Sequence, residues 1–321
     1  MDRAAATSAA RTLIDNVEQV IRGQRSSIEA ATTCLFAGGH LLIEDVPGVG
    51  KTMLARAIAR SIRGSFKRIQ ATPDLLPSDI TGSSIYSQKS QSFEFIPGPL
   101  FANVVLVDEI NRTTPRTQSA LLEAMDENAV TVDGVRHALA EPLFVIATQN
   151  PIEHHGTYPL PEGQLDRFAL TMDLGYVDRV TEQEIVRQQL EAHPIDELEA
   201  VLDPEEVAAV RTVVRSTHVS EPVLGYALSL TGATRKHPDI ELGASPRASI
   251  TLVRCAQARA LIAGRDFVVP DDIKILAVAS LAHRVLPSAG LRLERGAVSR
   301  LVQGIVQSMP VPVTGPPEPP K

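Results

Sequence analysis

The chain has 321 residues, of which 44% are apolar and 21% are charged, and its formal net charge is −7. This length exceeds that of one domain of roughly 100 to 200 residues, so two structural units are expected. No apolar run approaches the roughly 18 residues of a membrane span, which argues against an integral membrane protein. The acidic balance and the lack of tryptophan disfavour nucleic-acid binding, because that needs a clustered basic surface and aromatic platforms for stacking.

The N-terminal residues contain neither a continuous apolar segment nor a small-residue cleavage site. They do not have the pattern of a secretory signal, so a cytoplasmic location is expected. Cys34 and Cys255 are far apart in the sequence and have no partner at the spacing of a metal or redox pair. We expect both to be buried thiols.

After a first helix at 1–18, residues up to 176 alternate short β-rich runs with amphipathic helical stretches. This alternation predicts an α/β unit with a parallel sheet covered by helices. Four of the runs are almost continuously apolar, as strands buried on both faces are. The expected strands are 40–44, 65–70, 103–108, 143–149 and 168–173. Helices are expected after the first and third strands, at 52–62 and 114–127, with Thr114 capping the second.

The first strand leads into the sequence DVPGVGKT at 45–52, which matches a phosphate-binding loop of the kind that binds ATP. Gly48 and Gly50 allow backbone N–H groups to converge on phosphate oxygens in front of a helix N-terminus. Lys51 is expected to reach the β- and γ-phosphates, and the Thr52 hydroxyl to ligate Mg²⁺. The loop residues expected to contact the nucleotide are Pro47, Gly48, Val49, Gly50, Lys51, Thr52 and Met53.

The loop departs from the full motif at one position, because Asp45 stands where glycine is usual. Aspartate tolerates unusual backbone angles better than most residues, so the turn can still form. We expect its carboxylate to point away from the phosphates.

Two acidic residues end the third expected strand. Asp108 and Glu109 follow the apolar run NVVLV, and the carboxyl ends of parallel strands meet at the edge where the phosphate loop lies. Asp108 is the candidate ligand of Mg²⁺, and Glu109 is the candidate that orients and polarises the attacking water. Capping of the strand end is the alternative for such a pair.

Two hairpins are expected within the α/β unit. In 74–100, the alternating sequence SFEFI and the boundaries at Gly82 and Gly98 predict a hairpin that projects from the sheet. In 129–139, the dipeptide Asp133-Gly134 predicts a two-residue turn.

From residue 177 the β-rich runs stop and helical periodicity continues to 308, which predicts a second, all-helical unit. Asp203-Pro204, Ser245-Pro246 and Pro270 mark helix starts, and Gly264 follows the end of the longest helix. Residues 309–321 are rich in proline and are expected to form an extended, disordered tail.

The segment VDEINRTTPRTQSALLEAMDE at 107–127 resembles the Walker B segment of the MoxR-type AAA+ ATPases. Other stretches agree, in order, along nearly the whole chain. They are IRGQ (21–24), EDVPGVGKT (44–52), DLLPSDITG (74–82), ATQNPIEHHGTYPLPEGQLDRF (147–168) and ASPRA (244–248). The resemblance implies an AAA+ core with hairpin inserts and a helical lid. It also implies an ATPase acting as an oligomeric ring, expected to be a hexamer, with ATP between adjacent subunits.

The resemblance assigns roles to individual residues. Asn150 matches the sensor 1 position, which contacts the γ-phosphate, although an asparagine before Pro151 can also simply start a turn. Ile21 and Gly23 belong to a stretch resembling the segment that packs against adenine.

Two arginines are also assigned by the resemblance. Arg167 matches the arginine finger that enters the neighbouring subunit's site, with an ion pair to Asp166 or Glu162 as the alternative. Arg247 matches sensor 2, which couples contact with the γ-phosphate to movement of the lid. Its place in a first helical turn is unfavourable for an arginine, which supports a functional role.

The leading hypothesis is an ATPase whose ring remodels or matures a partner protein, such as a client or a von Willebrand factor A-domain protein. Three alternatives stay open: a magnesium-chelatase-type ATPase subunit, a nucleotide-gated scaffold that hardly hydrolyses ATP, and a nucleic-acid motor. A metal site at His154 and His155 is disfavoured because no third ligand is spaced nearby. These histidines are instead expected to line the subunit interface.

Overall fold

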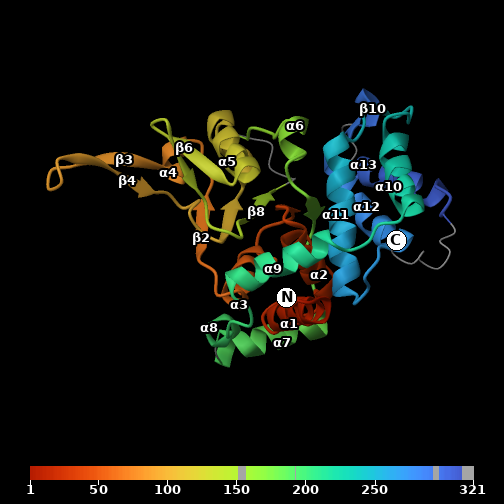
Figure 1. Ribbon diagram of the computed structural model, residues 1–321, viewed down its shortest axis with the longest axis horizontal. Coiled ribbons are helices and arrows are strands. Elements are labelled where there is room, and N and C mark those ends of the chain that lie inside the picture. Colours follow the sequence, from red (N-terminus) through yellow and green to blue (C-terminus); the bar gives the residue numbers. More distant parts are fainter. Residues whose placement is uncertain (151–156, 192, 292–295, 313–321) are drawn as a thin grey trace.

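The computed structural model describes residues 1–150, 157–191, 193–291 and 296–312 (Figure 1). Five parallel strands form the central sheet in the order β2-β5-β8-β1-β9. They are β1 (Leu41–Glu44), β2 (Phe66–Gln70), β5 (Val104–Asp108), β8 (Phe144–Gln149) and β9 (Leu170–Met172). The five predicted strands are confirmed, each with its ends within two residues of the prediction.

The two faces of the sheet are covered by different helices, because successive side chains of a strand point to opposite faces. Ile43 and Leu106 belong to the core that lies under three N-terminal helices. These are α1 (Arg3–Glu18), α2 (Arg25–Ala37) and α3 (Lys51–Ser61). Leu42 and Val105 belong to the core on the other face, with α5 (Pro115–Glu127). The sheet is therefore the middle layer of three, as the near-continuous apolar strands predict.

Both predicted hairpins are present. The first consists of β3 (Gly82–Ser87) and β4 (Ser92–Pro97), follows α4 (Pro77–Thr81), and projects far from the sheet (Figure 1). At its base the backbones of Gly82 and Gly98 approach closely, since a Cβ on Gly82 would lie 2.7 Å from the Gly98 nitrogen.

The second hairpin consists of β6 (Ala129–Val132) and β7 (Val135–Ala138). Its turn residues Asp133 and Gly134 both have positive φ, 53° and 78°, as a two-residue hairpin turn requires.

Beyond β9 the chain is mainly helical. The helices are α7 (Arg179–Glu191), α8 (Pro194–Glu197), α9 (Pro204–Arg215), α10 (Glu221–Thr234), α11 (Pro246–Ile262), α12 (Pro270–Leu281) and α13 (Ala297–Ser308). α8 contacts α3, and α9 contacts α1 and α2, whereas α10 to α13 form a helical group beside the sheet (Figure 1). A short strand pair, β10 (Ile240–Leu242) with β11 (Leu286–Pro287), lies in this region and was not expected from the helical pattern.

α11 contacts α2, α9 and α12, so it joins the helical group to the core. It begins at the predicted cap Ser245, whose hydroxyl accepts from the N–H of Ala248, and Gly264 follows its end at a φ of 82°. The division of the chain at residue 177 stays a prediction. Most of the predicted proline-rich tail, residues 313–321, lies outside the described residues.

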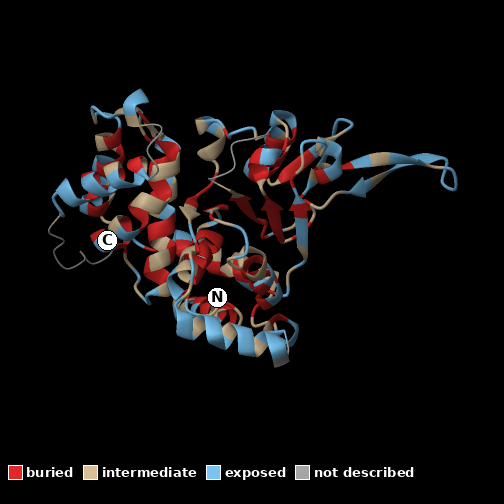
Figure 2. Cartoon of the chain, turned by 180° about the vertical axis from the view of Figure 1, so that it is seen from behind, coloured by how far each residue is buried: buried red, intermediate tan, exposed pale blue. Residues whose placement is uncertain are grey.

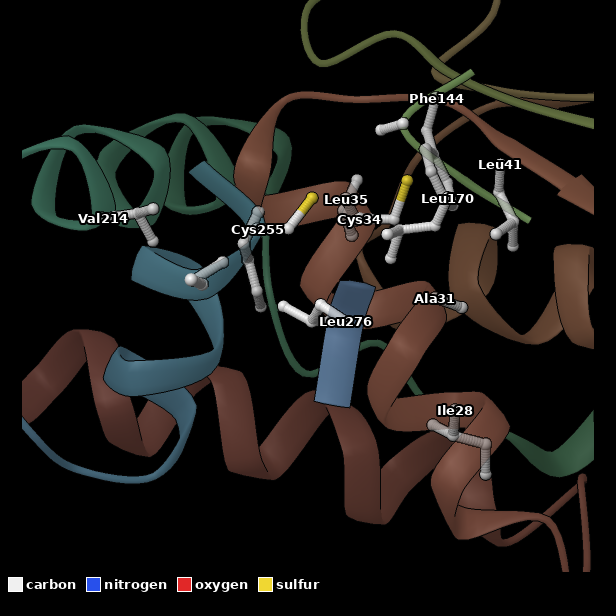
Figure 3. Packing of buried hydrophobic residues seen from close by; sticks show 14 of the residues in the cluster. Ile28, Ala31, Cys34, Leu35, Leu41, Phe144, Leu170, Val214, Cys255 and Leu276 are labelled. Carbon is white, nitrogen blue, oxygen red and sulfur yellow. The ribbon is translucent and has the colours of Figure 1, made fainter. Parts of the chain in front are cut away.

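Cys34 on α2 and Cys255 on α11 lie in the same hydrophobic core, as Figure 3 shows. Both are free and fully buried, which confirms that they are buried thiols. Burial raises the pKa of both thiols, that of Cys255 to about 12. A thiol that stays protonated is a poor nucleophile, so both cysteines contribute packing rather than chemistry.

Figure 2 shows buried residues concentrated in the sheet and in the helices against it, whereas the long hairpin is largely exposed. Over the part of the chain that the structure describes, no helix combines the length and the apolar character needed to cross a bilayer.

Candidate active site

A cavity of about 220 Å³ lies where the carboxyl ends of β1, β5 and β8 meet the N-terminus of α3. We call it the loop cavity. Parallel strands bring distant loops together at this edge of a sheet. Most of the predicted site residues line it: Pro47, Gly48, Gly50, Lys51, Thr52, Met53, Asp108, Glu109 and Asn150. The phosphate loop and the acidic pair, some 60 residues apart in the chain, are thus in one place.

The loop has the backbone expected of a phosphate cradle. Gly48 and Gly50 have φ values of 89° and 98°, which favour glycine. A Cβ at either position would meet nothing within 4 Å, so these glycines are required by backbone angle rather than by crowding. α3 begins at Lys51, directly after Gly50, and therefore places its N-terminus at the cavity.

Lys51 lines the cavity with its ammonium already engaged by the loop. Nζ donates to the carbonyl oxygens of Asp45 at 2.8 Å and of Val46 at 2.9 Å. Burial lowers the pKa of Lys51, while the charges of Asp45, Asp108 and Glu109 oppose that shift. The ammonium has three N–H donors and these two bonds use two of them, so Lys51 can bind an anion while it keeps its contact with the loop.

The acidic pair is held by neighbours from two strands, β2 and β8, and from a short 3-10 helix, η1 (Ile110–Arg112). Asp108 accepts from Arg68 on β2, with an Nε–Oδ2 distance of 2.6 Å. The N–H of Glu109 donates to the Thr148 hydroxyl on β8 at 2.9 Å, and Arg112 donates to the Glu109 carboxylate at 2.8 Å.

Glu109 has a positive φ of 58°, a conformation that costs an ordinary residue about 1 to 2 kcal/mol. Strain of this kind is concentrated at functional sites.

Three residues of the loop cavity were missed by sequence reasoning: Arg68, Gln70 and Thr148. Arg68 and Gln70 are two residues apart on β2, so they face the same side, and Arg68 also donates to the Gln70 side chain at 3.2 Å. The register of β2 with β5, which pairs Gln70 with Asp108, is the signal that could have found them. That register is not readable from a single sequence.

The donor set of the loop cavity fits Mg²⁺ and a triphosphate. Hard oxygen ligands suit Mg²⁺, and the Thr52 hydroxyl and Asp108 carboxylate both line the cavity. The lysine, the glycine turns and the helix N-terminus fit phosphate oxygens. Asp108 is paired with Arg68 through Oδ2, and its other oxygen, Oδ1, can contact a cation or a water bound to it without loss of that pair.

Three predicted nucleotide-binding residues are not among those that line the loop cavity. Val49 packs against the hydrophobic core. Ile21 is 7% exposed in that same core. Gly23 faces the start of α7, since a Cβ there would lie 2.8 Å from Cγ2 of Thr181. Their contact with nucleotide stays a prediction.

A second cavity, also of about 220 Å³, holds both predicted arginines. Asp126, at the end of α5, forms ion pairs with Nε of Arg167 and with a terminal nitrogen of Arg247, each at 2.8 Å. We call it the arginine cavity. Asp126 is therefore the ion-pair partner of Arg167, in place of the two candidates named from the sequence, Asp166 and Glu162. Asp166 is instead paired with Arg284 at 3.1 Å.

The two cavities lie at opposite ends of β1. The loop cavity follows Glu44, whereas the arginine cavity is lined by Gly38, Gly39 and His40, which precede Leu41. Arg247 therefore lies beside Arg167 and not beside its own phosphate loop. The predicted roles of both arginines stay predictions.

The histidines His154 and His155 lie outside the described residues.

Comparison with known proteins agrees with this organisation. The model of the ATPase family associated with various cellular activities (AAA) matches residues 40–170, and the model of the AAA lid domain matches residues 232–300. The chain is 48% identical to the uncharacterized protein YeaC of Bacillus subtilis, over 94% of each chain. It is 36% identical to Chaperone MoxR1 of Mycobacterium tuberculosis, over 93% of this chain and 81% of that relative.

A crystal structure of a candidate ATPase from Cytophaga hutchinsonii superposes with a TM-score of 0.90 at 36% identity, covering 97% of both chains. These similarities extend over nearly all of the sequence and include the sheet, the loop cavity and the helical group. The chain belongs to the MoxR family of AAA+ ATPases.

Proposed function

We propose that this chain hydrolyses ATP with Mg²⁺ as cofactor. Lys51 and the loop N–H groups bind the phosphates, and Thr52 and Asp108 hold Mg²⁺, which neutralises phosphate charge when bound. Glu109 orients a water molecule and accepts its proton, the role of a general base. Asn150 contacts the γ-phosphate from the end of β8. The shared loop cavity supports these assignments, because it brings all five side chains to one edge of the sheet.

The observation that carries the proposal is the separation of the two cavities. Arg167 and Arg247 are held at the far end of β1 from the phosphate loop of the same chain. An arginine that neutralises charge at the reacting phosphate is worth on the order of 10³ to 10⁵ in rate. In our proposal both arginines therefore serve the loop cavity of an adjacent subunit, and each nucleotide site is complete only at an interface.

Such an interface uses two different surfaces of each subunit and generates a ring when the rotation closes. We propose a hexameric ring in the cytoplasm. ATP binding and hydrolysis at the interfaces move the helical group against the core, and the ring uses this motion to remodel or mature a partner protein. The similarity to Chaperone MoxR1 supports a chaperone-like role. A client or a von Willebrand factor A-domain protein is the expected partner.

Steady-state phosphate release by the purified chain, measured with and without Mg²⁺ across a range of protein concentrations, tests the proposal. We expect Mg²⁺-dependent turnover whose specific activity rises with protein concentration as subunits assemble. Assembly on ATP without turnover would support the scaffold alternative instead. Turnover that depends on added DNA or RNA would support a nucleic-acid motor.

The partner is best sought with the Glu109→Gln variant, which is expected to bind ATP and hydrolyse it very slowly. This variant, immobilised and held in the ATP-bound state, should retain a client protein that the wild-type chain releases. Recovery of a porphyrin-pathway protein would favour the magnesium-chelatase alternative over chaperone-like remodelling.

A further inference from the structure

Asp45 occupies the position where a phosphate-binding loop usually begins with glycine. Asp45 is only 8% exposed, and its carboxylate accepts hydrogen bonds from three backbone N–H groups. Oδ1 accepts from Val46 at 2.7 Å, whereas Oδ2 accepts from Leu174 at 2.8 Å and from Gly175 at 2.7 Å. Leu174 follows Asp45 by 129 residues. The carboxylate therefore fastens the start of the phosphate loop to the chain that leaves β9.

We call residues 173–181 the connecting segment, because they lead from β9 into α7. Gly175 in this segment is held from two sides. Its N–H donates to Asp45, and its carbonyl accepts from the Gln24 side chain at 3.2 Å. Its φ of 69° favours glycine, so the peptide keeps an orientation that serves both bonds. Gly23 packs against Thr181 of the same segment. The phosphate loop and residues 21–24 thus meet at one short stretch of chain.

Lys51 connects Asp45 to the contents of the loop cavity. Its ammonium donates to the Asp45 carbonyl at 2.8 Å and to the Val46 carbonyl at 2.9 Å. Because Lys51 lines the cavity, an anionic oxygen there can accept from the third N–H of the ammonium and draw it away from these carbonyls. Such a movement weakens the bond to the Asp45 backbone carbonyl, and the side-chain carboxylate of the same residue holds the connecting segment.

We propose that Asp45 is a positioning residue that couples occupancy of the phosphate loop to the order of the connecting segment, and through it to residues 21–24. This inference rests on the proposed binding of ATP by the loop. The coupling would account for an aspartate at the position where the motif has glycine. A glycine would preserve the turn but would deprive Leu174 and Gly175 of the acceptor that they share.

Hydrogen exchange of the full-length chain tests the coupling, because it reports local opening without requiring turnover. We compare wild type with Asp45→Gly, which restores the motif residue, and with Asp45→Asn, which keeps the size and removes the charge. Each is measured with and without Mg²⁺ and ADP. We expect ADP to change exchange at the Leu174 and Gly175 amides of wild type by about tenfold or more. In both variants these amides should exchange rapidly in either state, and ADP affinity should change by no more than the factor by which ADP alters exchange in wild type.

Asp178→Asn is the matched control. Asp178 lies in the connecting segment and accepts from the N–H groups of Val180 at 2.9 Å and Thr181 at 3.1 Å, with no bond to the loop. Its substitution should speed exchange at Val180 and Thr181 and leave the ADP response of Leu174 and Gly175 intact. The inference is overturned if Asp45→Gly and Asp45→Asn keep the wild-type ADP response at those amides, or if Asp178→Asn abolishes it equally.

The proposed function is judged separately in the same samples. Failure of the wild-type chain to bind ADP or to release phosphate from ATP would refute the proposed ATPase. An active wild type whose Asp45 variants keep the ADP response would refute the coupling alone.

Discussion

Glu109 is the side chain on which the proposed chemistry most depends, since it carries the positive φ and lines the loop cavity beside Asp108. In Glu109→Gln the charge that polarises water is lost while the shape is kept. We expect turnover to fall about 10² to 10⁴-fold, the usual contribution of a general base, with ATP affinity nearly unchanged. Phosphate release and equilibrium binding of a fluorescent ATP analogue measure the two effects.

The control for that substitution is Glu123→Gln, on an exposed position of α5. It should leave turnover at the wild-type level. Near-normal turnover in Glu109→Gln would remove Glu109 from its proposed role.

Asp126 forms ion pairs with both arginines of the arginine cavity, so its contribution to turnover should depend on the presence of those arginines. In Asp126→Asn we expect turnover to fall about tenfold or more with ATP affinity retained, because the arginine pair loses its shared carboxylate. Adding Asp126→Asn to Arg167→Ala should cause little further loss, since residues acting as one unit are not additive. A double-mutant cycle in turnover measures this coupling.

Glu127→Gln is the neighbouring control, because Glu127 pairs with Arg136 on the second hairpin instead. Fully additive losses in the cycle would show that Asp126 acts independently of Arg167.

Among the elements, the long hairpin depends on close backbone contact at its base. A Cβ on Gly82 would lie 2.3 Å from the Ile96 carbonyl oxygen, and Gly82 also has a φ of 91°. We expect Gly82→Ala to lower the free energy of unfolding by about 1 to 3 kcal/mol, the cost of strained backbone. Gly232→Ala, in α10 with nothing near its Cβ, should raise it by about 0.4 to 1 kcal/mol. Chemical denaturation measures both, and equal effects would contradict this account.

Two elements are held in place by buried neutral histidines. His40, just before β1, accepts from the N–H of Val145 at 3.1 Å, and His283 contacts the Phe168 carbonyl at 2.9 Å. Burial lowers the pKa of His40 to about 4 and that of His283 to about 3. An unfolded histidine has a pKa of about 6.5.

As pH falls below 6.5, the unfolded chain therefore binds protons that the folded chain excludes. Stability is fully present above pH 6.5 and is lost as pH falls toward the folded values. The free energy of unfolding of wild type falls between pH 7 and pH 5.5, and we expect this fall to be about 1 kcal/mol smaller in His40→Gln. His193→Gln, at an exposed position, is the control and should leave the fall unchanged. An unaltered pH profile in His40→Gln would contradict the assignment.

For the whole molecule, the placement of the cavities predicts that two inactive variants restore each other. Lys51→Ala loses the phosphate loop's cation but keeps the arginines, whereas Arg167→Ala keeps the loop and loses an arginine. In an equal mixture, about a quarter of the interfaces join an intact loop to an intact arginine cavity. We expect turnover near that fraction of wild type, measured by phosphate release after mixing. Failure to recover activity in mixed assemblies would place the arginine's action within one chain.

The strands of the sheet, the phosphate loop and the acidic pair were predictable because each is a pattern of consecutive residues. An apolar run followed by two glycines, Lys51 and Thr52 carries its own structural context. The bonds of Asp45 were not predictable, since they reach Leu174 across 129 residues of sequence. The pairing of Arg247 with Asp126 likewise depends on how α11 packs against the core, which no local pattern specifies. Contacts between distant segments thus supply what the motifs omit.

The opposite placement of the two cavities along β1 gives any assembly built through them a direction. On the proposed arrangement, an open chain of subunits has one end that presents a bare phosphate loop and another that presents a bare arginine pair. Growth at the two ends then involves different chemistry, and nucleotide acts at only one of them. A subunit with one of these surfaces blocked against docking, rather than deprived of a single side chain as in Lys51→Ala or Arg167→Ala, would stop growth from one side only, and the side that it blocks would reveal the order of subunits.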